Sequence, residues 1–589
     1  MERGVVMLFF LTINKNGIVS YFPHLERDKQ GSDVSLLTTP LPLAVIEEIQ
    51  DQLHRRKLLD MWNFGKNKNT KLEIIRLLND ICGDTLHFSW EQIQANTLSH
   101  QGRFEEEVKD EIGVRFNQIV LGRQISIRDF RGLARELKIL EERVIELAHR
   151  NVVQGKAQWV PSVKQHGRGW QCQRCGQEDV EEWPSLYGTA ATCRGCQSIG
   201  VSTSLDVLYR DQRLLIESPR EVIFLPHWDL TEAQRLASVQ VLNYIQEASE
   251  GRALLWAACG AGKTEVCFPS AAWALKQGKS VLFAAPRQDV IYDIMPRLKR
   301  DFPKYPLQVL TGESSVKFQS GGLVLATTHQ VLRFWRAFDI IFMDEMDAFP
   351  YQGSKALDWG LEHALRQGGK ILYLTATPSP EGLKLVKQGK MRLIQLPARH
   401  HRKPLPIPVW LKSAYSLEPN CNGCTEEVVL QIRTLRREGP VLVFVPKISW
   451  VGSWIKSLRQ YFPDWKVDGS YSSDLGRAQK IKRLIRGEFD LFVSTTILER
   501  GVTLPGIQVV VLGADHSIFD ERALVQMAGR VGRTQECPGG GVIYISKQIS
   551  PAMKTAVRWI KDQNRRAMEL GLLDQQEGRR NLERSQRSL

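Results

Sequence analysis

One short stretch of the sequence has the residues and spacing of a phosphate-binding loop. The stretch AACGAGKT runs from Ala257 to Thr264, between an apolar run and a segment of helical periodicity. Gly260 and Gly262 let backbone amides approach phosphate oxygens, and the start of a helix adds partial positive charge. Lys263 would reach the β and γ phosphates, and the Thr264 hydroxyl would hold Mg²⁺. The loop predicts an ATP site, although Ala257 replaces the first glycine of the commonest motif.

Acidic residues end a strand-like run further along the chain, in DIIFMDEMD. A Mg·ATP site needs a carboxylate at the end of a neighbouring strand and a base that orients water. Asp344 is therefore the predicted Mg²⁺ partner, and Glu345 the predicted water-orienting residue. An acidic run alone is usually a solvated loop, but its pairing with the phosphate loop favours the catalytic interpretation.

Two arginines in QMAGRVGRT (526–534) would complete such a site from the other side of a cleft. Arg530 and Arg533 stand three residues apart on one helical face, which suits a grip on the γ phosphate. GRVGR alone is more often a surface turn. Three further stretches accompany the loop and the acids in a fixed order: LTEAQ (230–234), TATPS (375–379) and STTILERGVT (494–503).

With these motifs in this order, the chain from about Leu230 to Ser546 resembles the superfamily 2 DEAD/DEAH-type helicase core. The resemblance implies two tandem RecA-like domains, with DEMD in the DExD position. It also implies individual roles: adenine recognition by Gln234, nucleotide binding by Gln526, coupling of the lobes by Thr375 and Thr377, contact with nucleic acid and nucleotide by Thr495, Thr496 and Arg500, and an arginine finger at Arg533 with Arg530 beside it.

Four cysteines precede the phosphate loop as two CxxC pairs: Cys172 with Cys175, and Cys193 with Cys196. Their spacing predicts a four-cysteine zinc ribbon whose thiolates leave no open position for water, and redox disulfides are the alternative. Another pair, Cys421 and Cys424, has no second pair nearby and is interpreted as loop thiols. The ribbon's aromatic and basic residues either stack on DNA bases or form its small core: Arg168, Trp170, Arg174, Trp183, Tyr187 and Arg194.

The elements around these motifs predict an α/β protein of several domains. Apolar runs that alternate with helical patterns predict buried parallel strands at 281–286, 323–327, 339–344, 370–375, 441–446, 490–496, 508–513 and 541–546. Near the start, residues 5–13 read as a strand, and leucine and valine spacing over 133–147 predicts an amphipathic helix. The expected division is a mixed, partly helical docking region (1–151), the ribbon (152–205), an ATP-binding RecA-like domain (206–398), a linker (399–408), a second RecA-like domain (409–565) and a basic tail (566–589).

Composition narrows the partners and the compartment. The 589 residues include 79 Lys and Arg against 65 Asp and Glu, a net charge of +14 with only 24% charged residues. This excess favours a polyanionic partner, although it would also aid solubility alone. No run reaches the roughly 18 apolar residues of a membrane span, and the N-terminal run lacks the flanks of a signal peptide. The chain is therefore expected in the cytoplasm.

A cysteine ribbon ahead of a helicase core resembles one family in particular, the ComFA late competence proteins. The four cysteines, LTEAQ and DEMD carry this resemblance, which does not extend to the first 150 residues. It implies an ATP-driven motor on single-stranded DNA entering through the ComEC channel, with ComFC as partner, at the inner face of the membrane. Two alternatives stay open: a PriA-like restart helicase, whose cysteines interrupt the helicase half, and a nucleic-acid-binding scaffold that ATP merely switches.

Overall fold

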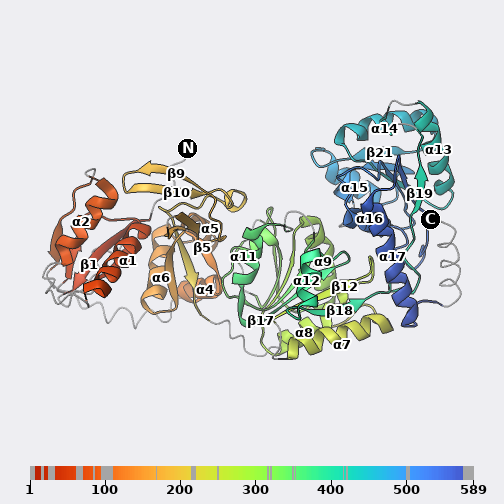
Figure 1. Cartoon of the computed structure of the whole chain (residues 1–589). Helices are drawn as coiled ribbons and strands as arrows, with labels where there is room; N and C mark the ends of the chain where they lie inside the picture. Colours follow the sequence, from red (N-terminus) through yellow and green to blue (C-terminus); the bar gives the residue numbers. More distant parts are fainter. Residues whose placement is uncertain are drawn as a thin grey trace.

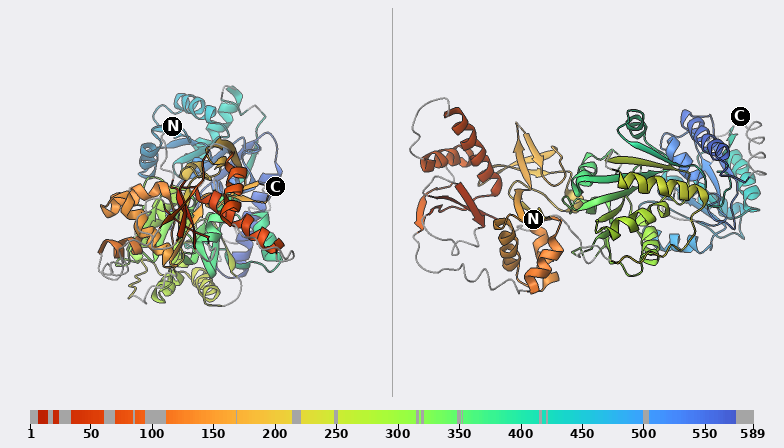
Figure 2. Two further views of the ribbon diagram at one scale, coloured as in Figure 1. Left: turned by 90° about the vertical axis from the view of Figure 1, so that its left-hand side faces the viewer. Right: turned by 90° about the horizontal axis from the view of Figure 1, so that it is seen from below.

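The computed structural model shows an elongated molecule with two parallel-sheet lobes at one end and a small antiparallel sheet at the other (Figure 1). The view from below shows the same succession of bodies along the long axis (Figure 2). Within the described part, no helix combines the length and hydropathy of a membrane span. The described residues are 7–14, 19–23, 34–60, 70–83, 86–93, 111–167, 169–213, 221–247, 251–314, 317–318, 321–347, 351, 353–414, 417–419, 422–498 and 504–574.

Lobe 1 (residues 221–396) is built on a seven-stranded parallel sheet. In spatial order its strands are β14 (Leu307–Leu310), β15 (Leu323–Thr327), β13 (Val281–Ala285), β16 (Phe338–Asp344), β17 (Leu365–Thr375), β12 (Arg252–Ala257) and β18 (Arg392–Leu396). Its helices are α7 (Glu232–Gln246), α8 (Phe268–Lys276), α9 (Gln288–Asp301), α10 (Thr328–Val331), α11 (Lys355–Ala364) and α12 (Pro380–Lys387). Because β16, β17 and β12 are neighbours and parallel, their carboxyl ends meet at one edge.

Lobe 2 (residues 409–574) repeats this architecture on a six-stranded parallel sheet. The strand order is β19 (Val409–Lys412), β24 (Val542–Ser546), β23 (Gln508–Leu512), β20 (Val441–Phe444), β22 (Leu491–Ser494) and β21 (Val467–Ser470). The helices are α13 (Asn422–Arg436), α14 (Ile448–Tyr461), α15 (Arg477–Ile485), α16 (Glu521–Ala528) and α17 (Pro551–Glu569). The predicted pair of RecA-like domains is confirmed, and the apolar runs form the buried strands because helices cover both faces.

The far end of the molecule carries a four-stranded antiparallel sheet with two helices. Its order is β2 (Val19–Pro23), β1 (Phe9–Asn14), β3 (Val34–Leu37) and β4 (Trp90–Ile93), accompanied by α1 (Leu43–Asp60) and α2 (Thr70–Cys82). The apolar run near the start is thus a strand, as predicted, and the N-terminal region is mixed and partly helical.

A second small module links this sheet to lobe 1. It contains α4 (Glu111–Val120), α5 (Ile127–Leu137), α6 (Glu141–Val153) and a three-stranded sheet of β5 (Gln124–Ser126), β11 (Val207–Asp211) and β6 (Ala157–Pro161). Strand β11 follows the four cysteines in the chain yet pairs with β5 and β6, which precede them. The cysteine ribbon is therefore an insertion within this module.

The single amphipathic helix predicted over 133–147 is two helices. Helix α5 stops where Lys138 adopts φ 58°, and its backbone amide caps carbonyls of the last turn. Leu140, predicted to face the core, is 75% exposed at the start of α6. The apolar spacing continued across the break because both helices bury a face in the same cluster, which includes Leu133, Leu137, Val144 and Leu147.

Candidate nucleotide site and metal centre

A cavity of about 690 Å³ lies between the two lobes and gathers most of the predicted ATP-site residues. Predicted residues that line it are Gln234, Gly260, Gly262, Lys263, Thr264, Asp344, Glu345, Gln526 and Arg533. The first seven come from lobe 1 and the last two from lobe 2. The cavity can therefore place groups of both lobes on one ligand.

The phosphate loop follows β12 and is shaped by two glycines with positive φ. Gly260 has φ 78° and Gly262 has φ 75°, values that residues with side chains rarely adopt. A Cβ on Gly262 would lie 2.5 Å from Nε2 of Gln234. Gln234 itself caps α7 with Thr231, and its Nε2 donates to the Ala261 carbonyl at 2.9 Å. The glutamine thus fixes the loop and the start of α7 together.

Lys263 and Thr264 converge on the carboxylate that ends β16. Nζ of Lys263 lies 2.9 Å from Oδ1 of Asp344, and the Thr264 hydroxyl donates to its Oδ2 at 3.0 Å. Burial acts to lower the pKa of Lys263, but Asp344 and Glu345 outweigh burial and raise it, so the lysine stays charged. The adjoining hydroxyl and carboxylate oxygens are the hard ligands that Mg²⁺ prefers, so these residues fit the ion.

Glu345, directly after β16, has a strained backbone. Its φ is 54°, an uncommon value for a residue with a side chain, and its amide donates to the Leu374 carbonyl at the end of β17 at 3.0 Å. This bond holds the turn that brings Glu345 to the cavity. Strain of this kind is concentrated at functional sites.

A chain of hydrogen bonds runs from the last acid of DEMD to lobe 2. The Thr375 hydroxyl donates to Asp347 at 2.7 Å, and the Thr377 hydroxyl donates to the other oxygen of the same carboxylate. Nε2 of Gln526 then donates to the Thr377 hydroxyl at 3.3 Å. The two threonines do not line the cavity but join its lobe 1 floor to α16.

The predicted arginines take different positions. Arg533 lines the cavity, and a Cβ on Gly260 would lie 3.6 Å from its Cγ, so the side chain stands over the phosphate loop. Its Nε donates to the Gly529 carbonyl at 2.8 Å. Arg530 is 1% exposed within lobe 2 and does not line the cavity. Thr495 and Thr496 follow β22 away from the cavity lining, and Arg500 lies outside the described residues.

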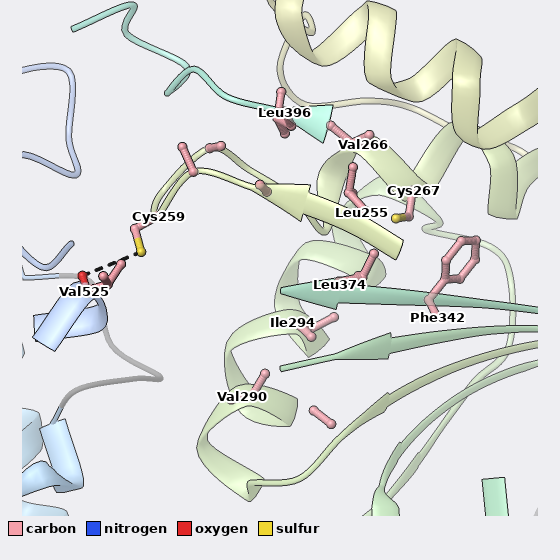
Figure 3. Close-up of a cluster of buried hydrophobic side chains, with 14 of the residues drawn as sticks. Leu255, Cys259, Val266, Cys267, Val290, Ile294, Phe342, Leu374, Leu396 and Val525 are labelled. Atoms are coloured by element: carbon pink, nitrogen blue, oxygen red, sulfur yellow. Dashed lines mark hydrogen bonds between the residues drawn. The ribbon is translucent and has the colours of Figure 1, made fainter. Parts of the chain in front are cut away.

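Where the lobes meet, the phosphate loop packs directly on α16. Figure 3 shows Cys259 pointing from the loop toward Val525, whose carbonyl lies 3.9 Å from the thiol. A Cβ on Gly529 would lie 2.5 Å from the Cβ of Cys259, so only a glycine fits there. The two lobes are thus in direct contact beside the cavity.

The sequence motifs did not identify three residues of this region. Phe224 and Trp228 line the cavity just ahead of LTEAQ, and Trp228 is 69% exposed. Their aromatic side chains, a few residues before the predicted adenine contact Gln234, were the feature of the sequence that could have indicated a place in the nucleotide site. Arg399, assigned to a linker, is buried between the lobes.

The four cysteines form a compact cluster between two hairpins. The hairpins are β7 (Val163–His166) with β8 (Gly169–Cys172), and β9 (Val180–Ser185) with β10 (Gly188–Cys193). Sγ atoms of Cys172 and Cys196 are 3.6 Å apart, as are those of Cys175 and Cys193, and all four lie within 4.8 Å of one another. A tetrahedral Zn²⁺ with bonds of about 2.3 Å separates its sulfur ligands by about 3.8 Å, so the residues fit zinc.

A neighbouring arginine stabilises negative charge on one of the four cysteines. Nε of Arg174 donates to Sγ of Cys196 at 3.4 Å. Hydrogen bonds from the other three thiols, led by Cys172, and the charge of Arg174 lower the pKa of Cys196. A thiolate is the metal-binding form, so the contact with Arg174 favours metal ligation by Cys196. The side chain of Cys424 and all of Cys421 lie outside the part whose side chains are described.

Most of the ribbon's aromatic residues have internal contacts. Trp170 packs against the cluster that contains the cysteines, and Tyr187 packs against the N-terminal core. Nε1 of Trp183 donates to Thr192 at 2.9 Å. Arg194 is exposed and lies 3.7 Å from Asp179, and Arg168 is outside the described residues. These contacts favour the core interpretation for Trp170 and Tyr187.

The ribbon rests on lobe 1 through a stack of rings. A Cβ on Gly176, directly after Cys175, would lie 2.3 Å from the indole of Trp359 on α11. Trp359 stacks on His363 with ring centroids 3.8 Å apart. Gln124 of the small module donates to the Leu332 carbonyl of lobe 1 at 3.0 Å and accepts from Arg210 at 2.8 Å. Ribbon, module and lobe 1 are joined by these contacts.

Two RecA-like lobes with phosphate-loop, carboxylate and arginine groups on one cleft define a helicase-like ATPase of superfamily 2. In agreement, residues 227–380 match the family model described as "Type III restriction enzyme, res subunit", and residues 424–535 match "Helicase conserved C-terminal domain". The chain belongs to the ComFA family. It is 36% identical over 422 residues to competence protein ComFA of Bacillus subtilis (strain 168), covering 70% of this chain and 89% of that protein.

Two further relatives place the match in context. Competence protein ComFA of Streptococcus pneumoniae (strain ATCC BAA-255 / R6) is 32% identical over 414 residues, 70% of this chain and 94% of that protein. The transcription-repair-coupling factor of Staphylococcus aureus (strain USA300) is 25% identical over 354 residues, 57% of this chain but 28% of that protein. The ComFA relatives are thus matched over most of their length.

Proposed function

We propose that this protein is an ATP-driven motor that moves single-stranded DNA inward during uptake for natural transformation. The observation that carries the proposal is the cavity between the lobes, to which lobe 1 contributes Lys263 and Glu345 and lobe 2 contributes Arg533. A ligand held from both sides converts its own cleavage into lobe movement. Membership of the ComFA family supports the link to uptake.

The residues of the cavity divide the chemical work. Lys263 binds the β and γ phosphates, Thr264 and Asp344 hold Mg²⁺, and Gln234 reads the base at the start of α7. Mg²⁺, when bound, neutralises charge on the phosphate oxygens. Glu345 orients a water for in-line attack on the γ phosphorus and accepts its proton, while ADP departs with the electrons of the broken P–O bond. Arg533 stabilises the charge that develops on the transferred group.

Loss of the γ phosphate removes the contacts that hold the cleft closed. Gln526 lies on α16, the helix that precedes Arg533. Its hydrogen bond to Thr377, which in turn binds Asp347, transmits this loss to lobe 2. Lobe 2 then moves relative to lobe 1, and alternate grip by the lobes advances the strand. In this scheme Arg530 supports Arg533, and Thr495, Thr496 and Arg500 carry the contact between nucleic acid and nucleotide.

The zinc assignment rests on the four-cysteine cluster, whereas the partners and the location rest on the resemblance to the ComFA family. The four-cysteine centre holds a structural Zn²⁺, and the N-terminal region positions the motor. The partners are the ComFC protein and the ComEC channel, and the chain works in the cytoplasm at the inner face of the membrane. Net charge +14 suits a polyanionic substrate.

The test is steady-state ATP hydrolysis without polymer and with single-stranded DNA of several lengths, duplex DNA or RNA at one salt concentration. A motor predicts stimulation by single strands that rises with length. Strong preference for duplex or forked DNA would instead support restart-type unwinding, and tight binding without stimulation would support an ATP switch. Lys263→Ala and Glu345→Gln should abolish turnover and keep nucleotide-free DNA binding; loss of both would contradict the assigned roles.

A further inference from the structure

The chain that connects the lobes contains a buried arginine. Lobe 1 ends with β18 at Leu396, and the sequence then reads PARHHRKPLPIP, rich in proline and positive charge. Such a composition predicts an exposed linker. Arg399 is nevertheless 1% exposed and is among the largest fully buried side chains. Burial lowers its pKa, so its charge must be stabilised locally.

Backbone carbonyls of both lobes provide that stabilisation. Nε of Arg399 donates to the Cys259 carbonyl in the phosphate loop at 2.9 Å. Nη1 donates to the Val531 carbonyl at 2.8 Å and the Gly532 carbonyl at 2.5 Å, and Nη2 to the Gly529 carbonyl at 3.3 Å. One planar guanidinium thus binds one carbonyl of lobe 1 and three of lobe 2, a pattern that matches its fork of donors.

The surroundings are shaped to admit this side chain. A Cβ on Gly260 would lie 3.8 Å from Nε of Arg399, and one on Gly532 would lie 3.0 Å from Nη1. The next two residues extend the same connection: His400 approaches the Gly260 carbonyl at 3.4 Å, and His401 the Gly532 carbonyl at 2.9 Å. Three consecutive residues therefore bind the same two backbone segments.

One of these carbonyls is shared with the arginine that lines the cavity. The Gly529 carbonyl accepts from Nη2 of Arg399 at 3.3 Å and from Nε of Arg533 at 2.8 Å. Arg399 does not line the cavity, whereas Arg533 does. Arg399 is therefore placed to fix the backbone on which Arg533 stands, at a set distance from the phosphate loop.

We propose that Arg399 is a positioning residue for ATP hydrolysis. When the cleft closes, Arg399 holds the segment 529–533 of lobe 2, which ends at Arg533, in a fixed position relative to the phosphate loop of lobe 1. This inference deepens the proposed function and rests on it. In an open cleft the Cys259 carbonyl separates from those of lobe 2, so the complete set of four bonds belongs to the closed state. Arg399 contributes to catalysis only through the placement of Arg533.

The experiment measures kcat and KM for ATP in Arg399→Ala, Arg533→Ala and the double variant. Displacement of a catalytic group by about 1 Å can cost about 100-fold in rate, so Arg399→Ala should lower kcat by about that factor. Its KM should stay within about threefold, because ground-state binding by the phosphate loop is kept. The double variant should be no slower than Arg533→Ala alone, since groups that act as one unit are not additive.

Arg402→Ala is the matched control. Arg402 lies in the same connection but is exposed, and its side chain contacts Asp574 and the Gly571 carbonyl instead of the cleft. Its loss should leave kcat unchanged. Equal losses in Arg399→Ala and Arg402→Ala would overturn the proposal, as would losses in Arg399→Ala and Arg533→Ala that multiply in the double variant.

Arg399→Lys covers the case in which Arg399→Ala does not fold. The ammonium keeps the charge but lacks the planar fork, so it cannot bind carbonyls of both lobes at once. We expect a normal melting temperature with kcat reduced about tenfold, as one strong hydrogen bond is lost; full activity would overturn the proposal. If no polymer stimulates the unaltered protein, the motor proposal fails, but the same comparison on the unstimulated rate still decides the role of Arg399.

Discussion

The contact between Gly176 and Trp359 predicts that lobe 1 helps to hold the metal centre. Gly176 has φ 71°, and its amide donates to the Cys172 carbonyl at 2.8 Å, which closes the first cysteine knuckle. An added Cβ would lie 2.3 Å from Cδ2 and 2.4 Å from Cε3 of Trp359. Gly176→Ala therefore combines backbone strain with a collision. Gly167→Ala separates the two effects, because Gly167 has φ 64° but no atom within 4 Å of its Cβ position.

The expected magnitude follows from these two terms. A non-glycine residue at positive φ costs about 1–2 kcal/mol, and this cost applies to both variants. Carbon atoms normally approach to about 3.5–4.0 Å, so only Gly176→Ala must displace the indole. Trp359 is stacked on His363 and cannot move away freely. Overpacking of this kind costs about 1–3 kcal/mol, which corresponds to a zinc Kd about 5- to 150-fold weaker than in Gly167→Ala.

The assay is competition for zinc between the full chain and a chromogenic chelator. Gly176→Ala should lose zinc at lower chelator concentration than Gly167→Ala. Adding Trp359→Ala to Gly176→Ala should restore part of the affinity, because removal of the indole relieves the collision. Equal zinc affinity of the two alanine variants would refute the reasoning, since it would mean that lobe 1 does not constrain the knuckle.

Three further outcomes can be checked on the same protein. Gln526→Ala removes the lobe 2 bond to Thr377, worth about 0.5–1.5 kcal/mol, so kcat should fall about 2- to 10-fold. A change in KM with kcat unchanged would argue against coupling. Cys259 is 4% exposed between the lobes, so its alkylation requires the cleft to open. An ATP analogue together with single-stranded DNA should slow this alkylation at least about tenfold, as measured by mass spectrometry. Cys537, which is exposed, is the control, and equal protection of both thiols would contradict cleft opening. Removal of residues 1–150 deletes Gln124 and β5, whereas removal of 1–110 keeps them. The longer deletion should therefore lower the melting temperature and the ATPase rate more, with a loss of stability of about 1 kcal/mol for each hydrogen bond to lobe 1 that is removed. Equal melting temperatures and rates in the two truncated proteins would contradict this.

The features that the sequence predicted correctly are those written in short contiguous stretches. Buried parallel strands are apolar throughout, so β13 and β15 were visible as uninterrupted runs. The cysteine spacing likewise predicted a cluster because each knuckle is local. The roles of individual site residues stay predictions, although the cavity collects most of them.

Other features depend on contacts that no local pattern encodes. Pairing of β11 with β5 and β6 across the ribbon is a long-range contact. The break between α5 and α6 is set by the left-handed conformation of Lys138. This conformation could not be predicted from the sequence, because lysine rarely adopts it. The burial of Arg399 could not be predicted from the sequence, because its neighbours are prolines and charged residues. Its side chain is buried only because the two lobes approach each other around it.

The location of the ribbon bears on which parts of the molecule move together. It packs on α11, the helix between β16, which ends at Asp344, and β17, which ends at Thr375. The cysteines also share a hydrophobic cluster with strands of lobe 1, and Gln124 binds the ribbon through the Arg174 carbonyl at 3.4 Å and lobe 1 through Leu332. Lobe 2 meets lobe 1 across a cleft bordered by Arg399 and Gln526. Opening of that cleft therefore moves lobe 2 against a body that already includes the ribbon, so a strand held by both would be displaced by the same movement.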